Sequence, residues 1–254
     1  MNYLPEKNIK RGAPIRRTID WSTKLILGVV GIGLFRSELM RIASLPYSLD
    51  NELYLALLAS TALLTAGWII VANKEFDIMC EFLDPEDYKP PDEIVTGLVV
   101  AATLTVLLYT SRNPIWFGIS YVVYAGLSIY AWWVVGFQMK TAIAKTHSRL
   151  DKDPKSDAPF IREALELLSS YYVKQPNIPR LVGCLILGVV GLGLAVFGQS
   201  KADMLLNEIA YVCFLLSIIG LEGGVAFYWR SKLYRGIGSL EIAKQEAERK
   251  AEEG

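Results

Sequence analysis

The sequence contains few side chains that bind metals or perform catalysis. It has one histidine, His147, and three cysteines, Cys80, Cys184 and Cys213, none of them in a Cys-x-x-Cys pair. His147 lies outside every long apolar run and has no other ligand type at a suitable spacing, so ligands for haem, zinc or an iron–sulfur cluster are lacking. No P-loop, HExxH or nucleophile-elbow pattern is present. We therefore expect a protein that is not an enzyme and holds no cofactor or metal.

The chain also lacks an excess of charge of either sign. Its 26 Lys and Arg residues are matched by 26 Asp and Glu residues, and the basic residues of segment 139–180 are accompanied by acids in the same segment. Nucleic-acid binding depends on a positively charged surface. We therefore expect no nucleic-acid partner, and contact with anionic lipids is enough to explain the basic residues.

Long apolar runs are what the sequence has in abundance, since 52% of its residues are hydrophobic. A helix of roughly 17–25 apolar residues crosses the hydrocarbon core of a bilayer. Five runs have about this length, namely Leu53–Val71, Ile94–Tyr109, Ile115–Phe137, Leu181–Gln199 and Leu205–Trp229. Trp132 and Trp133 fall near a predicted membrane interface, where a belt of aromatic residues is expected. These features predict an integral membrane protein that contacts the lipid bilayer.

A sixth span is predicted from a shorter run near the N-terminus. Its apolar core Leu25–Phe35 has 11 residues, but a helix over Trp21–Leu39 lets Lys24 and Arg36 extend to the two interfaces. A re-entrant or interfacial segment is the alternative. With this span counted and the N-terminus inside, 22 of the 26 basic residues lie on the inner side, as the positive-inside rule requires. We therefore expect a multi-pass protein with six spans and both termini in the cytoplasm.

The sequence repeats itself within the apolar runs. Residues 25–34 read LILGVVGIGL and residues 185–194 read LILGVVGLGL, with nine identities in ten positions. The matched glycines are Gly28, Gly31, Gly33, Gly188, Gly191 and Gly193. They are typical of close helix packing and not of a phosphate loop, because no strand precedes them and no Lys or Ser follows. We interpret the repeat as a duplication of the first and third pairs of spans.

The predicted fold is therefore an all-α integral membrane protein. Its six transmembrane helices form three helical hairpins, of which the first and third are copies, and its helices extend into the cytoplasm. The predicted segments are the basic N-terminal segment 1–20, hairpin 1 at 21–73, an acidic proline-rich linker at 74–93, hairpin 2 at 94–138, a cytoplasmic amphipathic segment at 139–180, hairpin 3 at 181–229 and a charged C-terminal helix at 230–254.

An amphipathic helix is predicted between the fourth and fifth spans. Asp157 occupies the N-cap position, Pro159 lies in the first turn, and the helix is expected to run to about Val173. Its apolar face is wide enough to be buried against other inner helices, the membrane surface or another protein. Segment 157–173 is thus a candidate docking site for a cytoplasmic protein, and we also expect self-association or a partner within a membrane complex.

Glu222 is the strongest candidate for a functional side chain. It is the only ionisable residue well inside an apolar span, where a carboxylate costs about 2.5–3.5 kcal/mol. One hypothesis is a cation or proton site, with Gly223 and Gly224 leaving room beside the carboxylate. The alternative is an uncharged carboxyl group, which burial favours, hydrogen-bonded to Ser217 or to a tyrosine such as Tyr121. No basic partner is expected inside any span.

Two further acids are expected near the outer ends of apolar helices. Glu52 and Glu208 each follow an asparagine, after the first and second copies of the glycine repeat. Together they would form an outer ring that concentrates cations. Acids near a helix N-terminus also cap the helix and interact with its dipole, and we favour this second interpretation.

Two classes of function fit these features. The first is a channel or a permease for ions or small solutes, acting as an oligomer or complex subunit and lined by the glycine-rich helices and Glu222. The alternative is a non-catalytic membrane scaffold or assembly subunit that docks a partner through its cytoplasmic helices. The duplication and the buried acid favour transport, and the scarcity of polar residues in the spans argues against it. We expect transport, although a Glu222 sealed from water would favour the scaffold.

Overall fold

A computed structural model describes the chain over residues 49–83, 113–152, 158–174 and 177–253, and at single residues within 33–44 and 102–110. The predicted spans at 21–39 and 94–109 lie outside the described residues, apart from those single residues. Gly28 and Gly31 of the first repeat copy also lie outside them.

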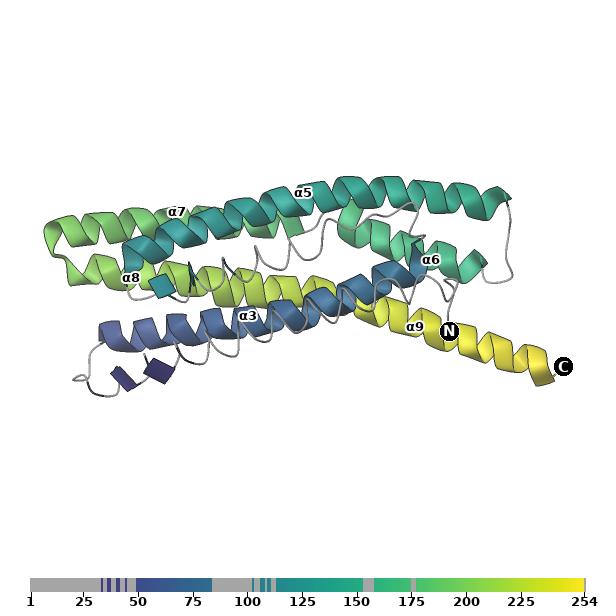
Figure 1. Ribbon diagram of the computed structural model, residues 1–254, viewed down its shortest axis with the longest axis horizontal. Coiled ribbons are helices and arrows are strands. Elements are labelled where there is room, and N and C mark those ends of the chain that lie inside the picture. The colour runs from purple at the N-terminus through teal and green to yellow at the C-terminus, as the bar shows by residue number, and fades with distance from the viewer. Residues whose placement is uncertain are drawn as a thin grey trace.

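Every element that the described ranges contain is a helix. In chain order the elements are α3 (Leu49–Phe82), α5 (Pro114–Lys152), α6 (Ala158–Leu168), η2 (Ser169–Val173), α7 (Asn177–Lys201), α8 (Met204–Leu215), η3 (Leu216–Val225) and α9 (Ala226–Glu253), with η2 and η3 being π-helices. Figure 1 shows an elongated bundle in which α5 lies along α7, α8 lies between α7 and α3, and α6 lies between α5 and α9. The segments α8, η3 and α9 follow one another without a break.

Among the described residues, three helices are long and apolar enough to cross a membrane. They are Pro114–Lys152, Pro159–Lys201 and Met204–Ala243. A shorter apolar helix, Asn51–Leu64, lies within α3. An all-helical fold is therefore confirmed for the described part of the chain, whereas six spans in three hairpins with an internal duplication remain a prediction.

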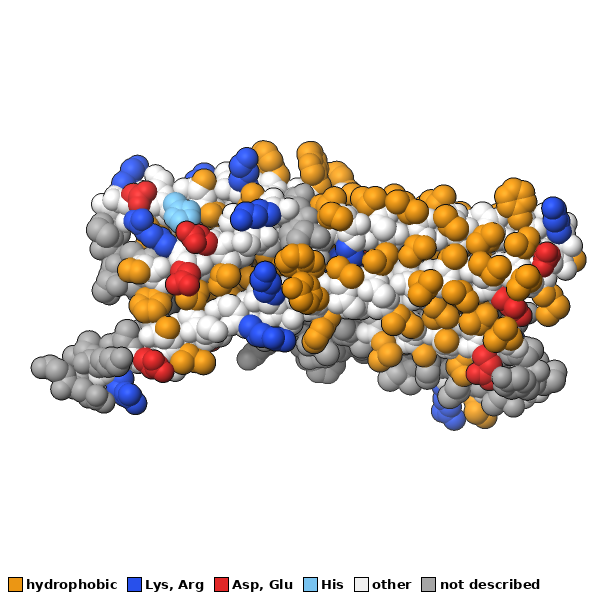
Figure 2. Space-filling model, turned by 180° about the vertical axis from the view of Figure 1, so that it is seen from behind, with side chains coloured by type: hydrophobic (Ala, Val, Ile, Leu, Met, Phe, Trp, Pro, Cys, Tyr) orange, Lys and Arg blue, Asp and Glu red, His pale blue; other side chains and the backbone are white. Residues whose placement is uncertain are grey.

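Apolar side chains cover the half of the molecule that contains the α7–α8 turn. Figure 2 shows them spread over this half, with acidic and basic side chains gathered at its tip and over the other half. Large side chains that are more than half exposed include Trp116, Ile186, Phe197, Leu205 and Ile219. Soluble monomers rarely expose so extensive an apolar surface. The surface therefore suggests a membrane protein, in agreement with the three long apolar helices.

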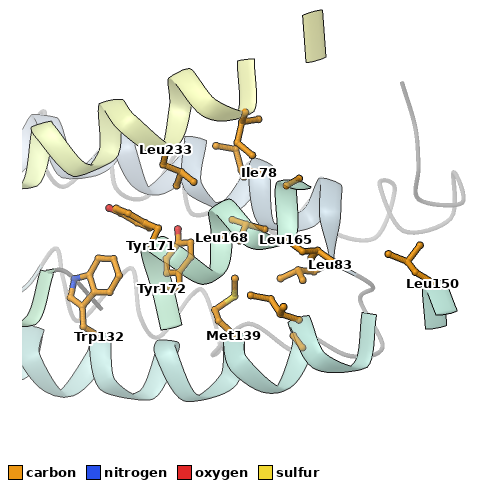
Figure 3. Close-up of a cluster of buried hydrophobic side chains, with 14 of the residues drawn as sticks. Ile78, Leu83, Trp132, Met139, Leu150, Leu165, Leu168, Tyr171, Tyr172 and Leu233 are labelled. Carbon is orange, nitrogen blue, oxygen red and sulfur yellow. The ribbon is translucent and has the colours of Figure 1, made fainter. Parts of the chain in front are cut away.

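The other half of the molecule is built around the amphipathic helix, formed by α6 and η2. Its apolar face packs against α5 and α9, and Leu165 and Leu168 are fully buried there (Figure 3). Burial of one such side chain stabilises the fold by about 1.5–3 kcal/mol. The apolar face that made 157–173 a candidate docking segment is thus covered by helices of the same chain.

Three aromatic rings lie at the end of this inner core that adjoins the apolar half of the molecule. Trp132 stacks on Tyr172 at 5.6 Å between ring centroids and meets Tyr171 edge-on at 5.5 Å, while the two tyrosine rings are 4.8 Å apart. Trp133 is 61% exposed, as an interfacial residue would be, but Trp132 is only 6% exposed. Trp132 therefore packs inside the bundle and does not face outward as Trp133 does, because Tyr171 and Tyr172 of η2 supply buried aromatic partners for it.

A second core holds α7 between α5 and α8. Phe214 of α8 meets Phe117 edge-on at 5.1 Å and Tyr121 at 6.3 Å. Phe214 reaches this position because Gly191 has no side chain, since a Cβ atom there would lie 2.8 Å from the Phe214 ring. Gly188 admits Tyr121 of α5 in the same way, with a nearest distance of 3.2 Å.

A tight turn joins α7 to α8. Ala202 adopts a left-handed conformation with φ of 52°, and the N–H of Asp203 donates to the carbonyl of Gly198 at 2.9 Å. This is the pattern that ends many helices, although glycine is the usual residue at the left-handed position. The Asp203 carboxylate then accepts from the N–H groups of Leu205 and Leu206 and caps α8.

Candidate functional site

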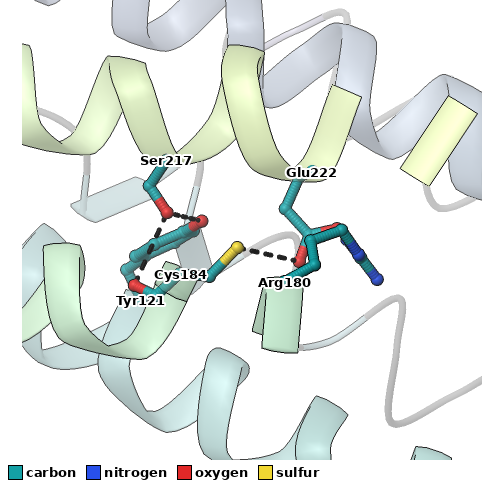
Figure 4. A network of polar contacts seen from close by, with 5 residues as sticks. All are labelled: Tyr121, Arg180, Cys184, Ser217 and Glu222. Carbon is teal, nitrogen blue, oxygen red and sulfur yellow. Dashed lines mark hydrogen bonds and ion pairs between the residues drawn. The ribbon is translucent and has the colours of Figure 1, made fainter. Parts of the chain in front are cut away.

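An ion pair lies inside the bundle where the first turn of α7 meets η3. Arg180 donates through Nη1 to the Oε2 atom of Glu222, and each side chain is only 1% exposed (Figure 4). Removing two charges from water is costly, and their attraction offsets this cost only when the geometry is good. The pair therefore fixes the start of α7 against η3.

Hydrogen bonds extend this site from Glu222 to α5. The thiol of Cys184 donates to Oε1 of Glu222 at 3.7 Å, and the hydroxyl of Ser217 donates to the carbonyl of Cys184 at 3.5 Å. Ser217 also lies 2.7 Å from the hydroxyl of Tyr121. Because the Ser217 proton is used on the carbonyl, the Tyr121 hydroxyl donates to Ser217. The contacts thus connect three helical elements, as the dashed lines in Figure 4 show.

The π-helical winding of η3 places Ser217 and Glu222 on the same side of the helix. In an α-helix each residue turns by about 100°, so side chains five positions apart point to different sides. A π-helix, with hydrogen bonds from i to i+5, winds more slowly. Both side chains consequently point toward α7 in Figure 4, and both residues are buried.

The partners of Glu222 differ from those expected from the sequence. Ser217 and Tyr121 are bonded to each other, and the carboxylate is paired with Arg180. The expectation that no basic residue accompanies the acid is therefore wrong. Arg180 lies one residue before the apolar run that begins at Leu181, so it was counted as part of the preceding inner segment. In the structure α7 begins at Asn177, which places Arg180 within the helix.

Gly223 and Gly224 lie on the outer surface of η3. Both are exposed, and a Cβ atom at either position would meet only a backbone carbonyl, at 3.5 Å and 3.6 Å respectively. The space that they provide is therefore on the outside of the bundle, away from the contact between Glu222 and Arg180.

Two polar residues of α7 carry buried atoms without a hydrogen-bond partner among the described residues. The atoms are Oδ1 and Nδ2 of Asn177 and Nε and Nη2 of Arg180. Asn177 is 1% exposed and Arg180 is 4% exposed. Buried polar groups in folded proteins nearly always have partners. No sequence signal marked these two residues, since a Pro-Asn-Ile-Pro-Arg segment resembles an ordinary helix start.

The remaining predicted site residues lie apart from this network. Glu52 is exposed on α3, and Glu208 is half-buried in the second turn of α8. Asp203, and not Glu208, is the N-cap of α8, and an interaction of Glu208 with the helix dipole stays a prediction. Gly33 and Gly193 have open space where a side chain would lie.

A groove separates α5 from α6 and η2 on the charged half of the molecule. It has a volume of about 480 Å³ and is lined by Lys140, Ile143, Ala144, His147, Glu166, Ser169, Ser170, Val173 and Lys174. The one histidine of the chain is half-buried at this groove. Among the described residues no group of three His, Cys, Asp or Glu side chains is arranged to hold a metal ion.

Comparison with known proteins adds no relative. No protein-family model, no curated protein and no solved structure matches the chain. Function is therefore argued from the geometry of the site alone.

Proposed function

We propose that the chain is a multi-pass integral membrane protein with six spans and both termini in the cytoplasm. Three long apolar helices and the exposed apolar half of the molecule support membrane insertion. The concentration of Lys and Arg in the inner segments supports the orientation. In this arrangement the apolar half is surrounded by lipid, and α6, η2 and the part of α9 after Trp229 lie on the cytoplasmic side.

Within the membrane we propose a non-catalytic role as a scaffold or assembly subunit. One observation carries this proposal, namely that Glu222 is held by Arg180 and Cys184 with its side chain 1% exposed. An ion pathway needs polar groups that exchange partners with water. A carboxylate enclosed in this way serves instead to fix helices in one arrangement.

The end of α9 is the proposed partner-binding element. Among the residues whose burial is described, Ile237 is the last buried residue of the helix and Leu240 the last that packs against the inner core, and the helix continues beyond the body of the molecule to Glu253 (Figure 1). Residues Glu241, Ile242 and Ala243 are all exposed. An isolated helix as short as the projecting segment 241–253 is marginal in water, and a partner helix would stabilise it.

Truncation after Leu240 tests this proposal, because it removes the projecting segment and keeps Leu240, which packs against the inner core. Proteins that co-purify with the full chain from its native membrane should be absent from the truncated chain. A chain with residues 241–254 in shuffled order controls for length and charge and should also lose the partner. Equal co-purification with all three chains would contradict a role for the tail.

Transport is the second candidate, and the Arg180 side chain favours it. Two guanidinium nitrogens are buried without a partner, and the π-helix η3 lies directly opposite. Short π-helical segments often occur at functional sites. If the ion pair opens during a transport cycle, ion or solute flux should depend on Glu222. If the ion pair is purely structural, Glu222→Gln should alter the stability of the protein and produce no flux.

A further inference from the structure

The start of α7 concentrates hydrogen-bond donors in one buried place. Asn177 and Arg180 are three positions apart in a helix, so their side chains are neighbours on one face. The first backbone N–H groups of a helix lack intrahelical acceptors; in α7 these belong to Asn177 and Ile178, because Pro179 has no N–H. The positive end of the helix dipole also lies there. Both effects favour an acceptor with negative charge at this position.

The free edge of Arg180 has the shape that oxyanions require. Glu222 contacts Nη1, whereas Nε and Nη2 have no partner among the described residues. The N–H groups on Nε and Nη2 are parallel and lie on one edge of the guanidinium plane. Two parallel N–H groups match two oxygens of a phosphate or carboxylate in a bidentate contact. The Asn177 amide supplies a further donor and is 1% exposed.

We propose that Asn177 and Arg180 form an enclosed binding site for one small oxyanion, with phosphate as the reference ligand. The two N–H groups on the Nε–Nη2 edge of Arg180 donate to two oxygens of the oxyanion. The amide group of Asn177 and the N-terminus of α7 donate to a third oxygen. This site goes beyond the scaffold role and does not depend on whether the chain transports anything.

Glu222 sets the charge of the site. Its carboxylate already balances the single positive charge of the guanidinium, so it weakens the attraction for a second anion on the opposite edge. Replacing Glu222 by Gln should consequently raise the affinity for phosphate. A site that merely holds the fold together gives no reason for this increase.

Two sources present this chemistry. Free phosphate could enter from the cytoplasm, and the phosphate group of a lipid could enter from the inner leaflet, because the predicted fifth span begins at Leu181. Both side chains are at most 4% exposed, so exchange requires local opening of the start of α7. Binding must therefore be measured after long equilibration.

Direct binding to the purified full chain tests the site. In the first arm, protein in a neutral, phospholipid-free detergent is dialysed against radiolabelled inorganic phosphate at constant ionic strength set by chloride. In the second arm, phosphatidylglycerol is added to the same micelles, with diacylglycerol as the control for its tails, and bound lipid is measured by native mass spectrometry. We expect one saturable site per chain in at least one arm, and competition between the arms if both bind.

Three variants connect the binding to the named atoms. Arg180→Lys keeps a charge beside Glu222 but lacks the two-nitrogen edge, and Asn177→Asp replaces the amide by a like charge. Each should weaken binding by about tenfold or more, the usual loss for a hydrogen bond to a charged group. Arg162→Lys is the matched control, because Arg162 is about half exposed in an ion pair with Asp151; it should leave binding unchanged.

The outcomes distinguish the two sources of the oxyanion and show whether the site exists. Binding of phosphate that both α7 variants weaken supports a free oxyanion, and binding of phosphatidylglycerol alone supports a lipid headgroup. If neither ligand binds saturably, or if Arg180→Lys and Asn177→Asp bind as tightly as the wild type while remaining folded by circular dichroism, the proposal is overturned.

Discussion

Glu222 and Arg180 lie 42 positions apart in the chain and form an ion pair inside the helical bundle, where η3 crosses the first turn of α7. The pair is surrounded by Cys184, Ser217 and Tyr121, which provide the next layer of hydrogen bonds. This arrangement explains how a glutamate is accommodated in an otherwise apolar helix. It also yields predictions that can be checked on the purified protein.

Removal of one partner of the ion pair should destabilise the fold more than removal of both. Arg180→Met leaves the buried carboxylate without its cation and should lower the free energy of unfolding by about 3–5 kcal/mol. The double variant Arg180→Met with Glu222→Leu should recover most of this loss. Unfolding of the single and double variants in detergent measures the difference, and strictly additive effects would contradict direct pairing.

The hydrogen bond between Tyr121 and Ser217 should be asymmetric in its energetics. Ser217→Ala leaves the buried Tyr121 hydroxyl without its acceptor and should cost about 1–3 kcal/mol. Tyr121→Phe removes the donor, while Ser217 keeps its contact to the carbonyl of Cys184, so the cost should be smaller. The same unfolding experiment measures both; a larger loss for Tyr121→Phe would show that the hydroxyl has a further acceptor.

Two glycines of the same repeat should respond in opposite directions to alanine. Gly191→Ala places a Cβ atom 2.8 Å from the Phe214 ring and should destabilise the protein by about 1–3 kcal/mol through overpacking. Gly193 has open space at the same position, so Gly193→Ala should be neutral or stabilise by up to about 1 kcal/mol through helix propensity. Thermal unfolding of the two variants in parallel measures these changes in stability. Equal changes would contradict the packing of α7 on α8.

Ala202→Gly should stabilise the turn between α7 and α8. A left-handed conformation costs a residue with a Cβ about 1–2 kcal/mol, and Ala202 has φ of 52°. Glycine relieves this cost but gains freedom in the unfolded chain, worth about 0.4–1 kcal/mol. The net gain should be up to about 1 kcal/mol, measured by unfolding. Ala202→Val is the control and should destabilise, because a β-branched residue tolerates this conformation less well.

Much of the helical framework could be predicted from the sequence because it depends on local patterns. The apolar runs at 115–137, 181–199 and 205–229 all lie within described helices, and the amphipathic helix ends at Val173 as expected. The position of that helix against α5 and α9 could not be predicted, because an apolar face does not specify what covers it. The burial of Trp132 follows from the same tertiary contact.

The candidate site was predicted only in part. Glu222 stood out because a charge in an apolar run is costly, but its partner Arg180 did not. Pairing between residues so distant in sequence is set by how α7 and η3 dock, and no local pattern encodes it. The π-helical winding of η3, which brings Ser217 and Glu222 to one side, also had no recognisable signal in the sequence.

The most direct test of the account is flux of ions and small solutes in proteoliposomes containing the wild-type chain or Glu222→Gln. A sealed, structural ion pair predicts no flux above that of empty liposomes for either chain, with a loss of stability in the variant. Flux through the wild type that changes in magnitude or selectivity in Glu222→Gln would contradict the scaffold role and establish a transport pathway along η3.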